Sequence, residues 1–164
     1  MPPILRPPDY PPIFPLGFHY LSMTDVERMC VDHFPLSVGR RALMTGLTTL
    51  VQRLIDSAVT GEVWVDGSFV TEKIEPKDVD VLLRCQGPLY NNGTVDQRAA
   101  IDWVIDNQKP TLKCDSYVLM EYPEGNSLYE EGLWWHSYWH TKWGFSREEE
   151  PKGILVIPLT GAMS

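Results

Sequence analysis

The sequence Val65-Asp66-Gly67-Ser68, followed after nine intervening residues by Asp78-Val79-Asp80-Val81, decides our interpretation of the fold. Side chains on a strand alternate between its two faces, so the second stretch places two carboxylates side by side on one face. Like charges that close need compensation, by a raised pKa or by a divalent cation, and Mg²⁺ prefers hard oxygen ligands. The Gly-Ser pair offers a phosphate a backbone without a Cβ, N–H groups and a hydroxyl. The two stretches therefore predict two strands that frame a site for metal and phosphate.

Further strands are predicted on both sides of these motifs. Residues 62–66 alternate in polarity and lead into the Gly-Ser pair, and residues 79–83 form a second β-rich run. Residues 112–122 predict a third strand, and residues 153–157 predict a last one. These runs are short and well separated, which predicts one small sheet.

Helical patterns dominate the first half of the chain outside the motifs. Thr24 and Glu27 have the spacing of a capping box, which predicts a short helix ending near His33. A longer helix is predicted from about Ser37. Its apolar residues recur at spacings that place them on one face, at Leu43, Leu47, Leu50, Leu54 and Ala58.

The second half of the chain contributes two more predicted helices. Thr94 and Gln97 form another capping box, which opens a helix that ends before Pro110. Residues 127–143 are rich in Trp, Tyr and His and predict a helix. The order of helices and strands predicts an α+β or α/β fold, in which helices pack on a small mixed β-sheet.

The first residues differ in composition from the rest of the chain. Seven of the 14 prolines fall within residues 1–15, and prolines lack N–H groups and fix φ, so we predict an extended arm over residues 1–20. Apolar residues such as Ile13 and Phe14 favour an arm that wraps over the domain, although a polyproline ligand for a partner is the alternative. Residues 21–164 are then a single domain.

Composition limits the classes of function. The 164 residues, 43% of them hydrophobic, suit one domain with a core. A net charge of −8 disfavours non-specific binding to duplex DNA. No apolar run approaches the roughly 20 residues of a membrane span. We therefore expect a soluble, cytoplasmic protein without a membrane partner, in which the three cysteines are buried, reduced thiols.

The motifs also resemble those of a known superfamily. A strand ending in Gly67-Ser68, a gap and an Asp-x-Asp strand are similar to the signature of polymerase-β nucleotidyltransferases. The chain also resembles a poorly characterised group of small bacterial nucleotidyltransferase-like proteins. This resemblance lies in the sequence of residues 64–73, in Pro76-Lys77-Asp78-Val79-Asp80 and in the late Pro151-Lys152-Gly153-Ile154. The resemblance is strongest at the core motif and weak elsewhere.

The resemblance implies roles for individual residues. By position, Gly67 and Ser68 would bind phosphates, and Asp78 and Asp80 would bind two Mg²⁺ ions with a third carboxylate from a neighbouring strand. We assign that third carboxylate to Asp115, within the third predicted strand, where it would also serve as the base.

Two lysines are candidate nucleotide ligands. Lys152 would reach a triphosphate as a point charge. Lys77 lies in the motif loop, where it would bind phosphate or merely offset the charge of the neighbouring Asp78.

The implied reaction is magnesium-dependent transfer of a nucleoside monophosphate from a nucleoside triphosphate, with ATP as the expected donor. The acceptor would be an RNA, a protein or a small molecule. Small stand-alone members of the superfamily include toxins and defence proteins, so an antitoxin or a second copy of the chain is an expected partner. One alternative is a catalytically inactive module that binds a nucleotide or a partner. Another is a phosphohydrolase that uses water as the acceptor.

Two further groups of residues leave alternatives open. Arg40, Arg41 and Arg53 would either contact substrate or lie on the solvated flank of a helix. The aromatic residues of the last predicted helix would either stack on a base or pack on the sheet. The spacing of Trp135, Trp139 and Trp143 favours packing.

Overall fold

A computed structural model describes residues 10–146 and 149–159. Its framework is a five-stranded mixed sheet in the order β1-β5-β2-β3-β4. β2 is antiparallel to both of its neighbours, and the two outer pairs, β1 with β5 and β3 with β4, are parallel. The strands are β1 (Gly17–Tyr20), β2 (Glu62–Asp66), β3 (Val79–Gln86), β4 (Cys114–Glu121) and β5 (Gly153–Pro158). The α+β class with a small mixed sheet and the four predicted strands are confirmed.

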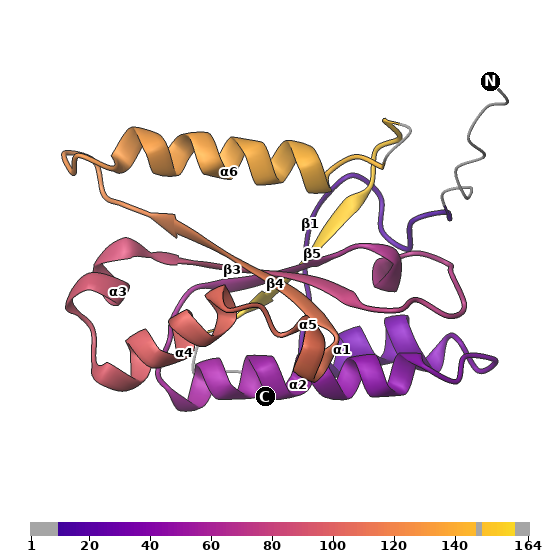
Figure 1. The fold of residues 1–164 in the computed structure, drawn as a ribbon. Helices are drawn as coiled ribbons and strands as arrows, with labels where there is room; N and C mark the ends of the chain where they lie inside the picture. The colour runs from indigo at the N-terminus through magenta and orange to yellow at the C-terminus, as the bar shows by residue number, and fades with distance from the viewer. Residues whose placement is uncertain (1–9, 147–148, 160–164) are drawn as a thin grey trace, which may run out of the picture.

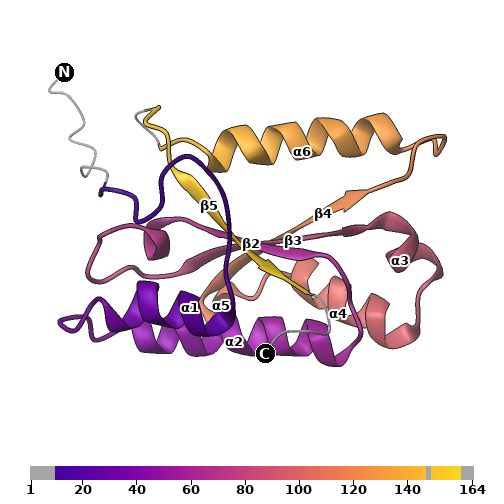
Figure 2. The same cartoon turned by 180° about the vertical axis from the view of Figure 1, so that it is seen from behind.

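Helices cover both faces of the sheet (Figure 1). α6 (Tyr129–Trp143) lies alone on one face, and α1 (Met23–Glu27), α2 (Arg40–Asp56) and α4 (Val95–Ile105) lie on the other, as the reverse view also shows (Figure 2). The connection from β3 to β4 contains α4 and two short helices. These are α3 (Gly87–Asn92) and α5 (Lys109–Leu112).

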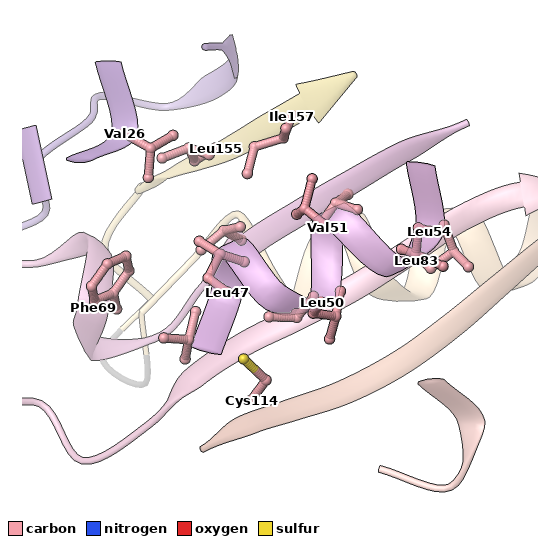
Figure 3. Packing of buried hydrophobic residues seen from close by; sticks show 14 of the residues in the cluster. Val26, Leu47, Leu50, Val51, Leu54, Phe69, Leu83, Cys114, Leu155 and Ile157 are labelled. Atoms are coloured by element: carbon pink, nitrogen blue, oxygen red, sulfur yellow. The ribbon is translucent and has the colours of Figure 1, made fainter. Parts of the chain in front are cut away.

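The larger part of the core lies between α2 and the sheet. Leu47, Leu50 and Leu54 of α2 are fully buried and face strand residues such as Leu83 (Figure 3). The predicted leucine face is therefore confirmed. Its last member is not part of the helix, because α2 ends at Asp56 and Ala58 has a positive φ of 59°.

A smaller cluster lies under α6. Trp139 and Trp143 are buried against Trp64 and Ile154 of the sheet. Their predicted packing role is confirmed, whereas Trp135, at the same spacing, is 40% exposed. The side chains of this cluster occupy alternate strand positions, so Trp64 and the residues two positions away from it share the face covered by α6.

Several element boundaries differ from the prediction for local reasons. The first helix is capped by Ser22, whose hydroxyl accepts from the Asp25 N–H, and not by Thr24. It continues into a π-helical turn, η1 (Arg28–Asp32). β4 begins later than predicted because residues 109–112 form a helical turn that ends at Lys113, where φ is 57°. The capping box of Thr94 and Gln97 is confirmed.

The described end of the proline-rich segment packs on the domain. Phe14 is buried, its carbonyl accepts from the Gly153 N–H at 3.0 Å, and the Ile13 N–H donates to the Val70 carbonyl at 2.9 Å. Residues 17–20 form β1 at one edge of the sheet. Residues 1–9 of the predicted arm lie outside the described residues.

Two further predictions concern burial and membranes. All three cysteines, Cys30, Cys85 and Cys114, are buried free thiols, as expected. Among the described helices, none is both long enough and apolar enough to cross a membrane.

Candidate functional site

Three neighbouring strands bring aspartates into one row. The register pairs Asp66 of β2 with Asp80 of β3, and Asp80 with Asp115 of β4. Residues opposite one another on adjacent strands point to the same face, which here is the α6 face, because Trp64 lies two residues before Asp66. Asp78 precedes Asp80 by two residues and adds a fourth carboxylate. The sequence predicted three members of this row and assigned no role to Asp66.

Gly67 brings its backbone against the carboxylate of Asp80. Its φ is 81°, a conformation that side chains with a Cβ disfavour, and a Cβ at this position would lie 2.5 Å from Asp80 Oδ2. Ser68 begins the short helix η2 (Ser68–Val70), and its carbonyl accepts from the Thr71 hydroxyl at 2.8 Å. The Ser68 hydroxyl makes no hydrogen bond to another described residue. The Gly-Ser pair therefore lies beside the carboxylate row, as predicted.

Two lysines neutralise part of the row. Lys152 Nζ lies 3.1 Å from Asp66 Oδ1, and Lys109 Nζ lies 3.3 Å from Asp78 Oδ2. Lys152 was predicted to approach the site, whereas Lys109, on α5, was not. Lys77 is exposed, and its ammonium forms no ion pair with any described carboxylate. The structure thus brings Lys152 to the candidate site and gives Lys77 no ion pair there.

Burial and mutual repulsion disfavour the charged forms of two members of the row. Burial raises the pKa of Asp66 to about 7, against the opposing effect of Lys152. Burial also raises the pKa of Asp80 to about 6, and the charges of Asp78 and Asp115 raise it further. Asp66 Oδ1 is buried, and the ammonium of Lys152 lies 3.1 Å from it. The row therefore carries more negative charge than its protein partners offset.

Asp115 is held by two hydrogen bonds. The Asn107 side-chain amide donates to Asp115 Oδ1 at 2.6 Å, and the Tyr117 hydroxyl donates to Asp115 Oδ2 at 3.1 Å. Burial, followed by the charge of Asp115, raises the pKa of Tyr117 to about 12, so the phenol stays a donor. Neither partner was predicted. The signal for Tyr117 was its position two residues after Asp115 on a strand.

A comparison with known families covers the whole of this site. A family model described as "Family of unknown function (DUF6932)" matches residues 8–158, which is most of the chain. The chain belongs to this family. No curated protein and no solved structure matches the chain. Membership of DUF6932 therefore includes every strand and every candidate site residue, and it brings no activity with it.

In this DUF6932 chain the aspartates of the row are suitable ligands for a hard divalent cation, but their side chains do not converge on one point. Within the described ranges, no three His, Cys, Asp or Glu side chains are arranged to hold a metal ion. Asp78 faces Lys109, and Asp115 faces its two hydrogen-bond donors. The set still offers carboxylate oxygens and excess negative charge, and Mg²⁺ prefers hard oxygen ligands of this kind. A metal ion would have to draw these side chains together.

Arg40 has a structural role beside the site. It is fully buried, lies 3.7 Å from the ring centroid of Phe34, and donates to the carbonyls of Cys30, Phe69 and Thr71 at 2.7–2.8 Å. It is therefore neither a substrate contact nor a solvated flank residue, as the two sequence alternatives had it. The guanidinium instead holds in place the loop that follows Gly67.

The other two arginines lie on the surface of the helical layer. Arg41 pairs with Glu27 and Asp32, and Arg53 lies over the Trp103 ring at 4.3 Å from its centroid. These partners agree with the flank alternative for both residues.

Proposed function

We propose that this chain is a Mg²⁺-dependent nucleotidyltransferase, which transfers a nucleoside monophosphate from a nucleoside triphosphate, ATP being the expected donor, to an RNA, a protein or a small molecule. The observation that carries the proposal is the row of Asp66, Asp80 and Asp115 on three neighbouring strands, with the Gly67 backbone against the Asp80 carboxylate. A cytoplasmic location and a role as a toxin or defence protein, with an antitoxin or a second copy as partner, belong to the same proposal.

Charge supports a cationic ligand at this row. Four carboxylates face two ammonium groups, those of Lys109 and Lys152, so a triphosphate alone would be repelled. Asp78, Asp80 and Asp115 would hold Mg²⁺, which when bound neutralises phosphate charge and lowers the pKa of an acceptor hydroxyl. Lys109, which is exposed, is free to leave Asp78 when a stronger cation arrives, because exposed ion pairs contribute little.

The residues around the row would bind and orient the substrate. Gly67 and Ser68 would receive the phosphates, since a backbone without a Cβ and a hydroxyl lie next to Asp80. Lys152 is fixed against Asp66 and would supply a positive charge at the same end of the sheet. Asp115 would take up the proton of the acceptor hydroxyl, and Tyr117 and Asn107 would fix its orientation.

A second candidate function is a nucleotide- or partner-binding module of the same fold without turnover. It is favoured by the present partners of the row, because Lys109 engages Asp78 and two donors occupy Asp115. These contacts compete with metal ligation. They would suit a protein that keeps the fold and the binding site but catalyses no reaction.

The proposal is tested by calorimetric titration of the four nucleoside triphosphates, in Mg²⁺ and in EDTA. The proteins are the wild type, the double variant Asp78→Ala/Asp80→Ala, and the exposed control Asp96→Ala on α4. Binding that requires Mg²⁺ and is lost only in the double variant supports the site. The double variant should keep its fold, because removing clustered carboxylates relieves repulsion.

Activity is then followed with α-³²P-labelled nucleotide and candidate acceptors. Labelled acceptor together with pyrophosphate supports the transferase. Binding without any product supports the second candidate function, and free nucleoside monophosphate without labelled acceptor supports a phosphohydrolase. If no triphosphate binds in Mg²⁺, the transferase proposal is wrong.

A further inference from the structure

A cavity of about 500 Å³ runs along β4 on the side that pairs with no other described strand. It is lined by Tyr117 and Leu119 of β4, by Ile105 of α4, and by Trp135 and Trp139 of α6. Its volume lies within the range of roughly 300–1,000 Å³ that is typical of sites for small organic ligands. The cavity is therefore large enough for a nucleoside.

The lining of this cavity is mainly apolar and aromatic. The rings of Tyr117 and Trp139 lie 4.9 Å apart, and Trp135 contributes a third ring while remaining 40% exposed. Apolar and aromatic residues that line a cavity and remain partly open to solvent are typical of ligand sites. Flat faces of this kind favour a planar aromatic ligand over an aliphatic one.

The cavity begins where the carboxylate row ends. Ser116, the residue after Asp115, lines it, and so does Tyr117, whose hydroxyl is bonded to Asp115. A ligand seated over the Tyr117 ring would therefore extend directly to the third carboxylate of the row. Because Ser116 and Tyr117 connect the cavity to Asp115, we treat the cavity and the carboxylate row as parts of one site.

We propose that this cavity binds the base of the nucleotide whose triphosphate lies at the carboxylate row. This inference rests on the proposed function, which makes a nucleotide the ligand. It assigns to the cavity the part of the site that holds the nucleoside. Base stacking on Trp135 and Tyr117 supplies affinity that does not depend on the metal, whereas the carboxylates supply affinity that does.

The experiment compares two adjacent tryptophans of α6 in the full chain. Trp135→Ala removes a ring from the cavity, whereas the control Trp134→Ala removes a ring that is 58% exposed and does not line it. Each protein is titrated with ATP in Mg²⁺, with inorganic tripolyphosphate in Mg²⁺, and with adenosine. Trp135→Phe is added because it keeps an aromatic face.

We expect Trp135→Ala to bind ATP and adenosine on the order of ten-fold more weakly than the wild type, as for the loss of one stacked base. Tripolyphosphate binding should not change. The Trp134→Ala variant should behave as the wild type, and Trp135→Phe should recover most of the affinity.

Two other results separate this inference from the proposed function. If ATP binds in Mg²⁺ with the same affinity in Trp135→Ala and wild type, the cavity proposal is overturned and the carboxylate site stands. If tripolyphosphate and ATP both fail to bind the wild type, the proposed function fails. Adenosine binding that depends on Trp135 then supports the cavity alone, and its absence overturns the cavity as well.

Discussion

Replacing Asp80 by asparagine should make the metal-free protein more stable and, at the same time, insensitive to Mg²⁺. The pKa of Asp80 is raised from its ordinary 3.8 to about 6, so the folded protein holds a proton that the unfolded chain has already released between these values. In the metal-free protein this carboxyl therefore lowers the free energy of unfolding as the pH rises from about 4 to 6. Above pH 6 the free energy of unfolding stays lower by the full amount. Asparagine has the same shape without the charge.

The size of the effect follows from the pKa. A shift of about two units corresponds to roughly 3 kcal/mol of unfolding free energy at pH 8 as an upper limit. This pKa already contains the attraction of Lys152 and Lys109, and solvent screens part of the remaining cost, so we expect a gain of about 1–2 kcal/mol. Mg²⁺ at one hundred times its dissociation constant would stabilise the wild type by about 2.7 kcal/mol and would not stabilise the variant.

Urea denaturation at pH 8, followed by tryptophan fluorescence in EDTA and in Mg²⁺, measures both effects. The exposed Asp96→Asn, in the first turn of α4, is the control and should lose a little stability, because an acidic side chain is favourable at a helix N-terminus. A metal-free Asp80→Asn protein that is less stable than the wild type would refute the reasoning, and so would equal stabilisation of both proteins by Mg²⁺.

Three further predictions concern residues around the site and in the core. Gly67→Ala should lower the melting temperature more than Gly125→Ala, because both positions have a positive φ but only at Gly67 does a Cβ meet Asp80; equal losses in thermal melts would contradict this. Arg40→Met should cost about 3 kcal/mol or more of unfolding free energy in urea, because three buried carbonyls lose their donor, whereas the surface variant Arg41→Met should cost less than about 1 kcal/mol. Burial raises the pKa of Cys30, Cys85 and Cys114 to about 12. None of the three thiols should therefore react with a disulfide reagent at pH 8 in the native state, and all three should react in guanidinium. A thiol that reacts as fast in the native protein as in guanidinium would argue against its burial.

Periodic patterns made much of this fold predictable. The leucines of α2 repeat at helical spacing over several turns, so the type and the buried face of this helix follow from local sequence. The strands around Gly67 and Asp80 were found as short β-rich runs, but their burial on both faces depends on the helices that cover the sheet. Three aspartates of the row were predicted. Strand alternation alone places Asp78 and Asp80 on one face, and the prediction of a third strand indicated Asp115. These inferences require no knowledge of long-range register.

What escaped prediction depends on long-range placement. Asp66 joins the row only because the register of β2 against β3 sets it opposite Asp80, and a slip of one residue would turn it away. Lys109 reaches Asp78 because residues 109–112 form a helical turn, where the sequence predicted the end of one helix before Pro110 and a strand from residue 112. Arg40 lies on the first turn of an amphipathic helix like many solvated arginines, and only the tertiary fold reveals the carbonyls that surround it.

The place of β5 in the sheet affects how the chain can fold as it is synthesised. β5 lies between β1 and β2 although it follows every other strand in the sequence. A nascent chain that has emerged only as far as β4 therefore has β1 with no strand to pair with, and the inner edge of β2 is open. Lys152 immediately precedes β5, so the partner of Asp66 arrives with the same segment. We expect that a ribosome-stalled chain lacking β5 retains an exposed sheet edge, binds chaperones that recognise such edges, and acquires a complete carboxylate site only when this last strand inserts.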